Sequence, residues 1–123
     1  MTDDVLQDLL AGPGLRARVP VATYRLQFNR VFPFVEATRL VPYLTTLGVS
    51  DVYASSYLSA QPGSMHGYDV VDHNPLNPEI GSAAEFEGFV AALRAHGMGQ
   101  ILDVVPNHMG IAAGCNPWWN DVL

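Results

Sequence analysis

The sequence predicts an α/β fold in which strands and helices alternate, in the order strand, helix, strand, helix, strand. Apolar residues recur at helical spacing in two segments, 34–47 and 82–97, and a short strand-like segment precedes and follows each of them. Strands separated by helices imply right-handed crossovers and a parallel sheet. Three such strands fit either a small doubly wound domain or the opening of an eight-stranded barrel.

The first predicted strand is 22–28. Its side chains separate into an apolar set on one face (Tyr24, Leu26, Phe28) and a polar set on the other (Thr23, Arg25, Gln27). Arg25 and Gln27 therefore either point into a polar barrel mouth or pair with carboxylates such as Asp72 or Asp103.

The first predicted helix covers 34–47, with an apolar stripe formed by Phe34, Ala37, Leu40, Val41, Leu44 and Leu47. Gly48 stands where a left-handed residue ends a helix. Pro42 has no N–H and clashes with the preceding turn, so we expect the helix to be kinked or broken there. The second strand is expected over 49–54.

The stretch 55–81 shows no periodicity and is crowded with Gly, Pro, Asn and Asp. Loops of that length in compact domains are usually functional when they also hold apolar residues. Within it, Tyr68 follows a glycine and either stacks on the apolar face of a sugar or packs on a helix. Asp72 and His73 match no known metal-ligand spacing, so no metal site is expected.

The second predicted helix begins at Ser82, because Ser82 and Glu85 form a capping-box pattern, and it ends at Gly97. The third strand, Ile101–Val105, is nearly all apolar, which indicates a strand buried on both faces of a parallel sheet.

Polar residues interrupt and follow this third strand. A carboxylate at Asp103 within an apolar strand is costly unless it is paired or hydrogen-bonded. It is either an internal acid that holds loop N–H groups or, with Asn107 and His108, part of a site at the carboxyl ends of the strands, where α/β enzymes bind ligands.

Composition excludes several classes of protein. The chain has 123 residues with 49% hydrophobic and only 15% charged side chains, which argues against disorder. All basic residues are arginines, and Arg94 is the only one after position 40, so we expect no nucleic acid and no membrane surface as partner. The N-terminal residues lack signal-peptide features, which predicts a cytoplasmic protein. Cys115 is the single cysteine of the sequence, so no disulfide can form within the chain.

We divide the chain into a leader (1–18), the strand and helix region (19–108) and the start of a long loop after the third strand (109–123). The sequence ends in apolar and aromatic residues with no stop signal, which suggests a truncated chain.

Asp103-Val104-Val105-Pro106-Asn107-His108 resembles the first signature of the α-amylase family, glycoside hydrolase family 13, at the end of the third strand of a (β/α)8 barrel. The segments 22–27, 62–73 and 116–119 are similar to one trehalose-forming branch of that family, so the resemblance covers about 20–123. It implies the first βαβαβ portion of a (β/α)8 TIM barrel, truncated after the third strand.

The resemblance also implies an activity, the conversion of the reducing-end α-1,4 linkage of a maltooligosaccharide into an α,α-1,1 linkage by intramolecular transglucosylation. Members of the family use a retaining mechanism with an Asp nucleophile, a Glu acid/base and a further Asp that assists. These residues belong to the fourth, fifth and seventh strands, so the chain holds no catalytic residue and by itself should be inactive.

By motif match, Tyr68 would stack on the sugar and His108 would bind its hydroxyls. Asp103 and Asn107 would brace the mouth of the barrel, with Arg25 among the substrate-binding residues. Asp72 and Gln27 would hold these residues in place without contacting the sugar themselves. We expect no cofactor and no metal; the partners are a maltooligosaccharide and the remainder of the barrel, in the same chain or supplied separately.

Two alternatives stay open from the sequence. One is another α-amylase family hydrolase or transglycosylase. The other is a non-catalytic carbohydrate-binding module that keeps the first strands of the barrel as a fold of its own.

Overall fold

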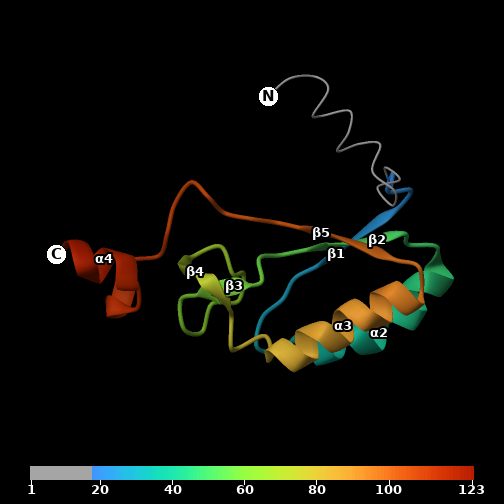
Figure 1. Cartoon of the computed structure of the whole chain (residues 1–123), viewed down its shortest axis with the longest axis horizontal. Coiled ribbons are helices and arrows are strands. Elements are labelled where there is room, and N and C mark those ends of the chain that lie inside the picture. Colours follow the sequence, from blue (N-terminus) through green and yellow to red (C-terminus); the bar gives the residue numbers. More distant parts are fainter. Residues whose placement is uncertain (1–17) are drawn as a thin grey trace, which may run out of the picture.

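The computed structural model describes residues 18–123. The expected leader, 1–18, lies outside the described residues except for Arg18, so that expectation stays untested. Figure 1 shows a small sheet with two helices on one side of it and a further short helix near the C-terminus, far from the sheet.

Three parallel strands form the sheet, β1 (Thr23–Leu26), β2 (Asp51–Ala54) and β5 (Gly99–Leu102). They lie in the order β1-β2-β5, with β2 in the centre. The parallel sheet predicted from the alternation of strands and helices is therefore confirmed.

The register of the strands decides which side chains share a face. Arg25 of β1 pairs with Tyr53 of β2, which pairs with Ile101 of β5, so these three side chains lie on one face. The neighbouring residues Leu26 and Ala54 belong to the opposite face and are fully buried in the core that the helices cover. The polar face of β1 is thus the face that the two helices packed on the sheet do not cover.

Helix α2 (Phe34–Leu47) matches the predicted helix residue for residue. Gly48 adopts φ 89°, and its N–H binds the carbonyl oxygens of Leu44 and Thr45, as expected for a left-handed C-terminal cap. Of the two outcomes expected at Pro42, a kink or a break, the break is wrong, because the helix runs through this residue without interruption. Its exposed ring lies on the solvent side, while buried neighbours such as Val41 hold the helix to the core.

Helix α3 (Ala83–Ala95) packs against α2. Its capping box is present, since the Ser82 hydroxyl accepts from the Glu85 N–H while the Glu85 carboxylate accepts from the Ser82 N–H. The sequence pattern therefore located the start of this helix correctly. The helix ends at Ala95, two residues before Gly97, which adopts φ 66°.

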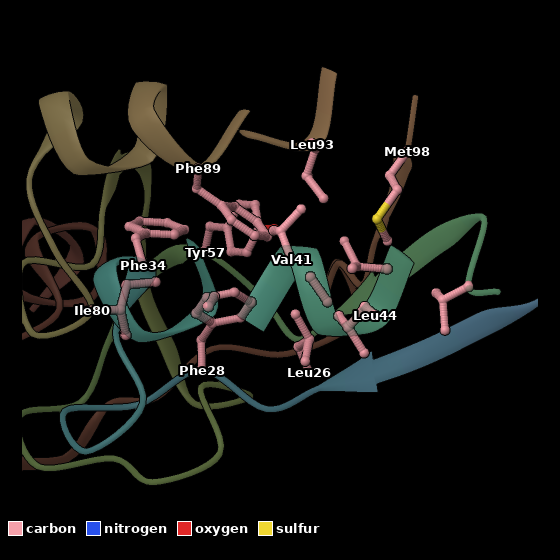
Figure 2. Close-up of a cluster of buried hydrophobic side chains, with 14 residues drawn as sticks. Leu26, Phe28, Phe34, Val41, Leu44, Tyr57, Ile80, Phe89, Leu93 and Met98 are labelled. Atoms are coloured by element: carbon pink, nitrogen blue, oxygen red, sulfur yellow. The ribbon is translucent and has the colours of Figure 1, made fainter. Parts of the chain in front are cut away.

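The hydrophobic core lies between the sheet and the two helices (Figure 2). Its centre is aromatic: the ring of Phe28 meets that of Tyr57 edge-on at 5.1 Å, and Tyr57 meets Phe34 at 5.0 Å. The remaining core side chains come from the strands, both helices and the segments that connect them, and include Leu26, Val41, Leu44, Ile80, Phe89, Leu93 and Met98.

The stretch 55–81, in which the sequence showed no periodicity, contains two strands. β3 (Leu58–Ala60) and β4 (Val70–Leu76) pair antiparallel, with register shifts on both sides of Ser59. No alternation is visible in the sequence of β4 because polar residues and Pro75 occupy consecutive positions at its centre and end.

The segment 109–123 holds a 3-10 helix, η1 (Ala112–Gly114), and helix α4 (Pro117–Val122). Asn116 is buried and caps α4, because its side chain accepts a hydrogen bond from the Trp119 N–H at 3.0 Å and donates one to the Gly110 carbonyl at 2.9 Å.

The prediction that the third strand is buried on both faces is wrong for the described residues. Ile101 and Leu102 of β5 are 38% and 46% exposed, and Val104 after it is 63% exposed. The physical reason is that β5 is an edge strand of the sheet, with β2 on one side only. The strand also ends at Leu102, one residue before Asp103, although the Asp103 N–H still binds the Ala54 carbonyl.

Candidate functional site

Three side chains from distant parts of the sequence meet at the carboxyl ends of β1 and β5, and we call Arg25, Tyr68 and Asp103 the Tyr68 cluster. The Tyr68 hydroxyl donates to Asp103 Oδ2 at 2.7 Å and accepts a short hydrogen bond from Arg25 Nη2. Arg25 Nη1 lies 3.3 Å from the same carboxylate oxygen. Each member thus contacts both others.

The sheet positions this cluster. Arg25 belongs to the face of β1 that the helices leave open, and Asp103 directly follows β5. Tyr68 belongs to the loop between β3 and β4, which approaches the ends of these strands. The sequence left Asp72 and Asp103 as alternative ion-pair partners of Arg25, and in the structure the partner is Asp103.

The contacts determine the charges in the cluster. The hydrogen bond from Tyr68 holds the pKa of Asp103 below its usual range, against the effect of partial burial and with help from Arg25. The same bond raises the pKa of the Tyr68 phenol. Partial burial alone would lower the pKa of Arg25, but the hydrogen bonds with Tyr68 and Asp103 outweigh it and raise that pKa. The cluster therefore holds a carboxylate anion, a neutral phenol and a guanidinium cation.

Two further aromatic side chains surround Arg25 and Tyr68, and the sequence analysis missed both. The Arg25 guanidinium lies over the ring of Tyr53 at 4.5 Å from its centroid. The ring of His66 stacks on that of Tyr68, with centroids 6.0 Å apart and planes inclined by 13°. The alternation of β2 could have indicated Tyr53, since it occupies the same face as Arg25.

Gln27, the residue after β1, lies next to the cluster. Its Oε1 accepts from Arg25 Nη2 at 3.3 Å, and its Nε2 donates to the His66 carbonyl at 2.7 Å. Gln27 therefore joins β1 to the loop that carries Tyr68.

The structure places the other expected site residues elsewhere. Asn107 and His108 are exposed and bind each other, with His108 Nδ1 donating to Asn107 Oδ1 at 3.0 Å. Asp72 lies in β4, where its Oδ1 accepts from the backbone N–H and side-chain amide of Asn74, both at 3.0 Å. The hydrogen bonds found among the described residues do not join these three side chains to the Tyr68 cluster.

Within residues 18–123, no group of three or more His, Cys, Asp or Glu side chains is arranged to hold a metal ion. In the same part of the chain, no helix has the length and apolar character needed to cross a membrane.

What the site can do follows from these contacts. An aromatic ring held at the carboxyl ends of parallel strands offers a flat apolar surface, and its hydroxyl is already engaged by Arg25 and Asp103. Such a ring suits the C–H face of a sugar. The Asp103 carboxylate, whose pKa is lowered, is ionised at neutral pH, which fits a binding or supporting role better than that of a proton donor.

Comparison with known proteins gives a consistent picture. The chain is similar to the maltooligosyltrehalose synthase from Arthrobacter ramosus, at 44% identity over 85% of this chain and 14% of that one, with a TM-score of 0.82. It is 43% identical over 109 residues, or 84% of this chain, to a curated Mycobacterium tuberculosis relative that is provisionally named a maltooligosyl trehalose synthase. It is also 38% identical to an intracellular maltogenic amylase of Bacillus subtilis over 81 residues, 66% of this chain and 13% of the relative.

The chain spans only 14% of the length of the curated Mycobacterium tuberculosis relative. The family model described as the alpha amylase catalytic domain matches residues 37–118, which include Tyr68 and Asp103. Since this match covers more than half of the sequence and the folds agree, the chain belongs to the alpha-amylase family.

Proposed function

We propose that the chain is the N-terminal part of an enzyme that converts the reducing-end α-1,4 linkage of maltooligosaccharides into an α,α-1,1 linkage by intramolecular transglucosylation. This is the isomerase reaction that forms maltooligosyl trehalose in trehalose biosynthesis. The observation that carries the proposal is the Tyr68 cluster, which presents an aromatic ring at the carboxyl ends of the parallel strands. The similarity to synthases of that name over 84–85% of the chain supports it.

In this proposal residues 19–108 supply the first three strands of a (β/α)8 barrel, and 109–123 begin the long loop after the third strand. The exposed apolar side chains of the edge strand β5 support the view that further strands cover it, because an unpaired strand edge is a liability in a stable protein. The barrel has to be completed by the remainder of the enzyme, in the same chain or supplied separately.

The roles that we propose for the site residues are those that the family resemblance implies. The Tyr68 ring stacks on the sugar at the cleaved linkage, and His108 binds sugar hydroxyls once the rest of the barrel is in place. Asp103 and Asn107 brace the mouth of the barrel. We assign no catalytic residue to the chain, because the nucleophile and the acid/base implied by the family resemblance belong to later strands. The 123-residue chain alone should therefore give no turnover.

The proposal also includes the expected environment of the enzyme. It acts in the cytoplasm on a neutral glucan and uses no nucleic acid or membrane as partner. The scarcity of basic residues after position 40 supports this choice of partner, since phosphate groups would require cations to bind them.

A chimera tests the proposed reaction directly. Residues 20–123 replace the matching segment of the Arthrobacter ramosus synthase, to which the chain is 44% identical. The chimera is incubated with maltopentaose, and products are separated and assayed for reducing ends. We expect a non-reducing maltooligosyl trehalose as the main product.

A folded chimera that only hydrolyses maltopentaose would instead point to another activity of the alpha-amylase family. The isolated chain, assayed in parallel, should give no product, and genuine turnover by it would contradict the assignment of the catalytic residues to later strands.

A further inference from the structure

Alternate residues of β1 and of the segment after it, at positions 25, 27 and 29, bind one loop. Arg25 Nη2 donates to the Tyr68 hydroxyl, Gln27 Nε2 to the His66 carbonyl at 2.7 Å, and Asn29 Nδ2 to the Met65 carbonyl at 3.1 Å. Side chains two residues apart in an extended chain share a face, which explains why all three reach the same loop.

The two amide side chains of this set are fully engaged. Gln27 uses Oε1 to accept from Arg25 and Nε2 to donate to the loop. Asn29 is buried at 9% exposure, and its Oδ1 accepts from the N–H groups of Val31 and Phe32 while its Nδ2 donates to the loop. Each therefore connects β1, or the turn after it, to the loop through a side-chain N–H. Glu and Asp have the same shapes as Gln and Asn but carry no such donor.

The loop also has internal hydrogen bonds that hold its shape. The Ser64 hydroxyl donates to Asp69 Oδ1 at 2.5 Å and accepts from the Gly67 N–H at 3.1 Å, and the Tyr68 N–H donates to His66 Nδ1 at 3.0 Å. These internal bonds set the shape of the loop but do not set its place relative to the sheet. The three side chains at 25, 27 and 29 fix that place.

The surroundings of Arg25 argue against direct contact with a ligand. Its guanidinium is committed to Tyr68, to the Asp103 carboxylate and to Gln27, and lies over the Tyr53 ring. Its charge is balanced by Asp103 at 3.3 Å. The sugar-binding role that the sequence suggested for Arg25 is thus less consistent with the geometry than a role exerted through Tyr68.

We propose that Arg25, Gln27 and Asn29 are positioning residues, a β1 clamp that fixes the loop 64–68 and so orients the Tyr68 ring for stacking on a glucose unit. The identity of the sugar rests on the proposed function, whereas the mechanical role of the clamp does not. In this view the polar face of β1 acts on the ligand through the loop and not by touching it.

Isosteric variants test the clamp in the 123-residue chain. Gln27→Glu and Asn29→Asp keep the shape and the accepting oxygen of each side chain, remove the N–H donor to the loop and add one negative charge each, for which the control below corrects. Amide hydrogen exchange of the peptides that cover 61–69 is measured by mass spectrometry. In the double variant we expect exchange there to be about tenfold faster, with unchanged exchange in α2 and α3.

A matched control makes the same chemical change elsewhere. Asn74→Asp with Asn120→Asp also removes two amide donors and adds two carboxylates, and these side chains bind Asp72 and the Gly114 carbonyl, away from the loop. Unchanged loop exchange in the clamp double variant, or an equal increase in the control, would overturn the clamp. If the double variant loses its helical circular dichroism, the two single variants decide in the same way, and each should accelerate exchange in the loop.

Activity provides the second readout. In the chimera described above, the clamp variants should raise the KM for maltopentaose about tenfold, and the control pair should leave it unchanged. An unchanged KM in folded clamp variants would overturn the positioning role toward the sugar. A chimera without transglucosylation would count against the proposed function only, because the exchange experiment decides the clamp without any sugar.

Discussion

The hydroxyl of Tyr68 donates a 2.7 Å hydrogen bond to Oδ2 of Asp103, a residue 35 positions later in the sequence. The bond joins the loop between β3 and β4 to the end of β5. Arg25 contacts both partners, so a change in one of them should be detectable at the others. Four predictions follow from this bond and from the packing around the sheet.

The first prediction concerns the titration of Tyr68. The hydrogen bond to Asp103 is the main cause that raises the pKa of this phenol, so Asp103→Asn should lower it and the phenolate should form at a less alkaline pH. The difference in phenolate absorbance between wild type and variant measures this in an alkaline titration. Glu36→Gln, which affects only an exposed ion pair with Arg39, is the control and should give no difference.

The second prediction concerns stability in acid. The pKa of Asp103 is lower in the folded chain than its ordinary value, so its ionised form stabilises the fold above about pH 4, and this contribution is lost as the pH falls through the folded pKa. Asp103→Asn should therefore reduce the urea midpoint at pH 7 and have a smaller effect at pH 3. An effect of equal size at both pH values would be inconsistent with this coupling.

The third prediction concerns the amino end of the sheet. A Cβ on Gly99 would overlap Asp51 Oδ1 and lie 3.3 Å from the Arg18 guanidinium, which pairs with Asp51 at 3.2 Å. Gly99→Ala should cost about 1–3 kcal/mol in the free energy of unfolding, because the ion pair must move.

Gly88 in α3 is the matched control for this substitution. A Cβ there has nothing within 4 Å, so Gly88→Ala should instead stabilise the chain by about 0.5–1 kcal/mol. Urea denaturation of both variants gives the comparison, and equal destabilisation by both would show that the Asp51 contact is unimportant.

The fourth prediction separates the ring of Tyr68 from its hydroxyl. Tyr68→Ala removes the stacking surface, and in the chimera it should lower kcat/KM by at least about tenfold. Tyr68→Phe keeps the ring but loses the bonds with Arg25 and Asp103, so its loss should be smaller. Steady-state kinetics with maltopentaose measures both. A Phe variant as impaired as the Ala variant would show that the hydroxyl, and not stacking, is what matters.

Much of the fold could be predicted because its signals are local. The bounds of α2 follow from its apolar period and from Gly48, and the start of α3 follows from Ser82 and Glu85. β3 and β4 could not be predicted, because their stability comes from pairing with each other and the pattern of β4 is obscured by its polar residues and Pro75. The continuity of α2 through Pro42 likewise depends on core packing and not on local preference.

The candidate site, like the fold, could be predicted only in part from the sequence. The sequence alone singled out Arg25, Tyr68 and Asp103 as side chains able to serve a site. Arg25 is on the polar face of the first predicted strand, Tyr68 follows a glycine in the long loop, and Asp103 interrupts the apolar third strand. It could not decide whether Arg25 pairs with Asp72 or Asp103, nor indicate Tyr53, His66 and Asn29 as neighbours.

The sequence by itself therefore determined the order of the three parallel strands and two helices along the chain, the polar face of β1 and the family resemblance. Only the tertiary structure decided which side chains meet, with Arg25 on Asp103, Gln27 on the His66 carbonyl and Asn107 with His108 apart from both. The physical reason is that periodicity and capping depend on residues a few positions apart. The contacts of the site join residues tens of positions apart, and these are set by strand register and by the path of the loop.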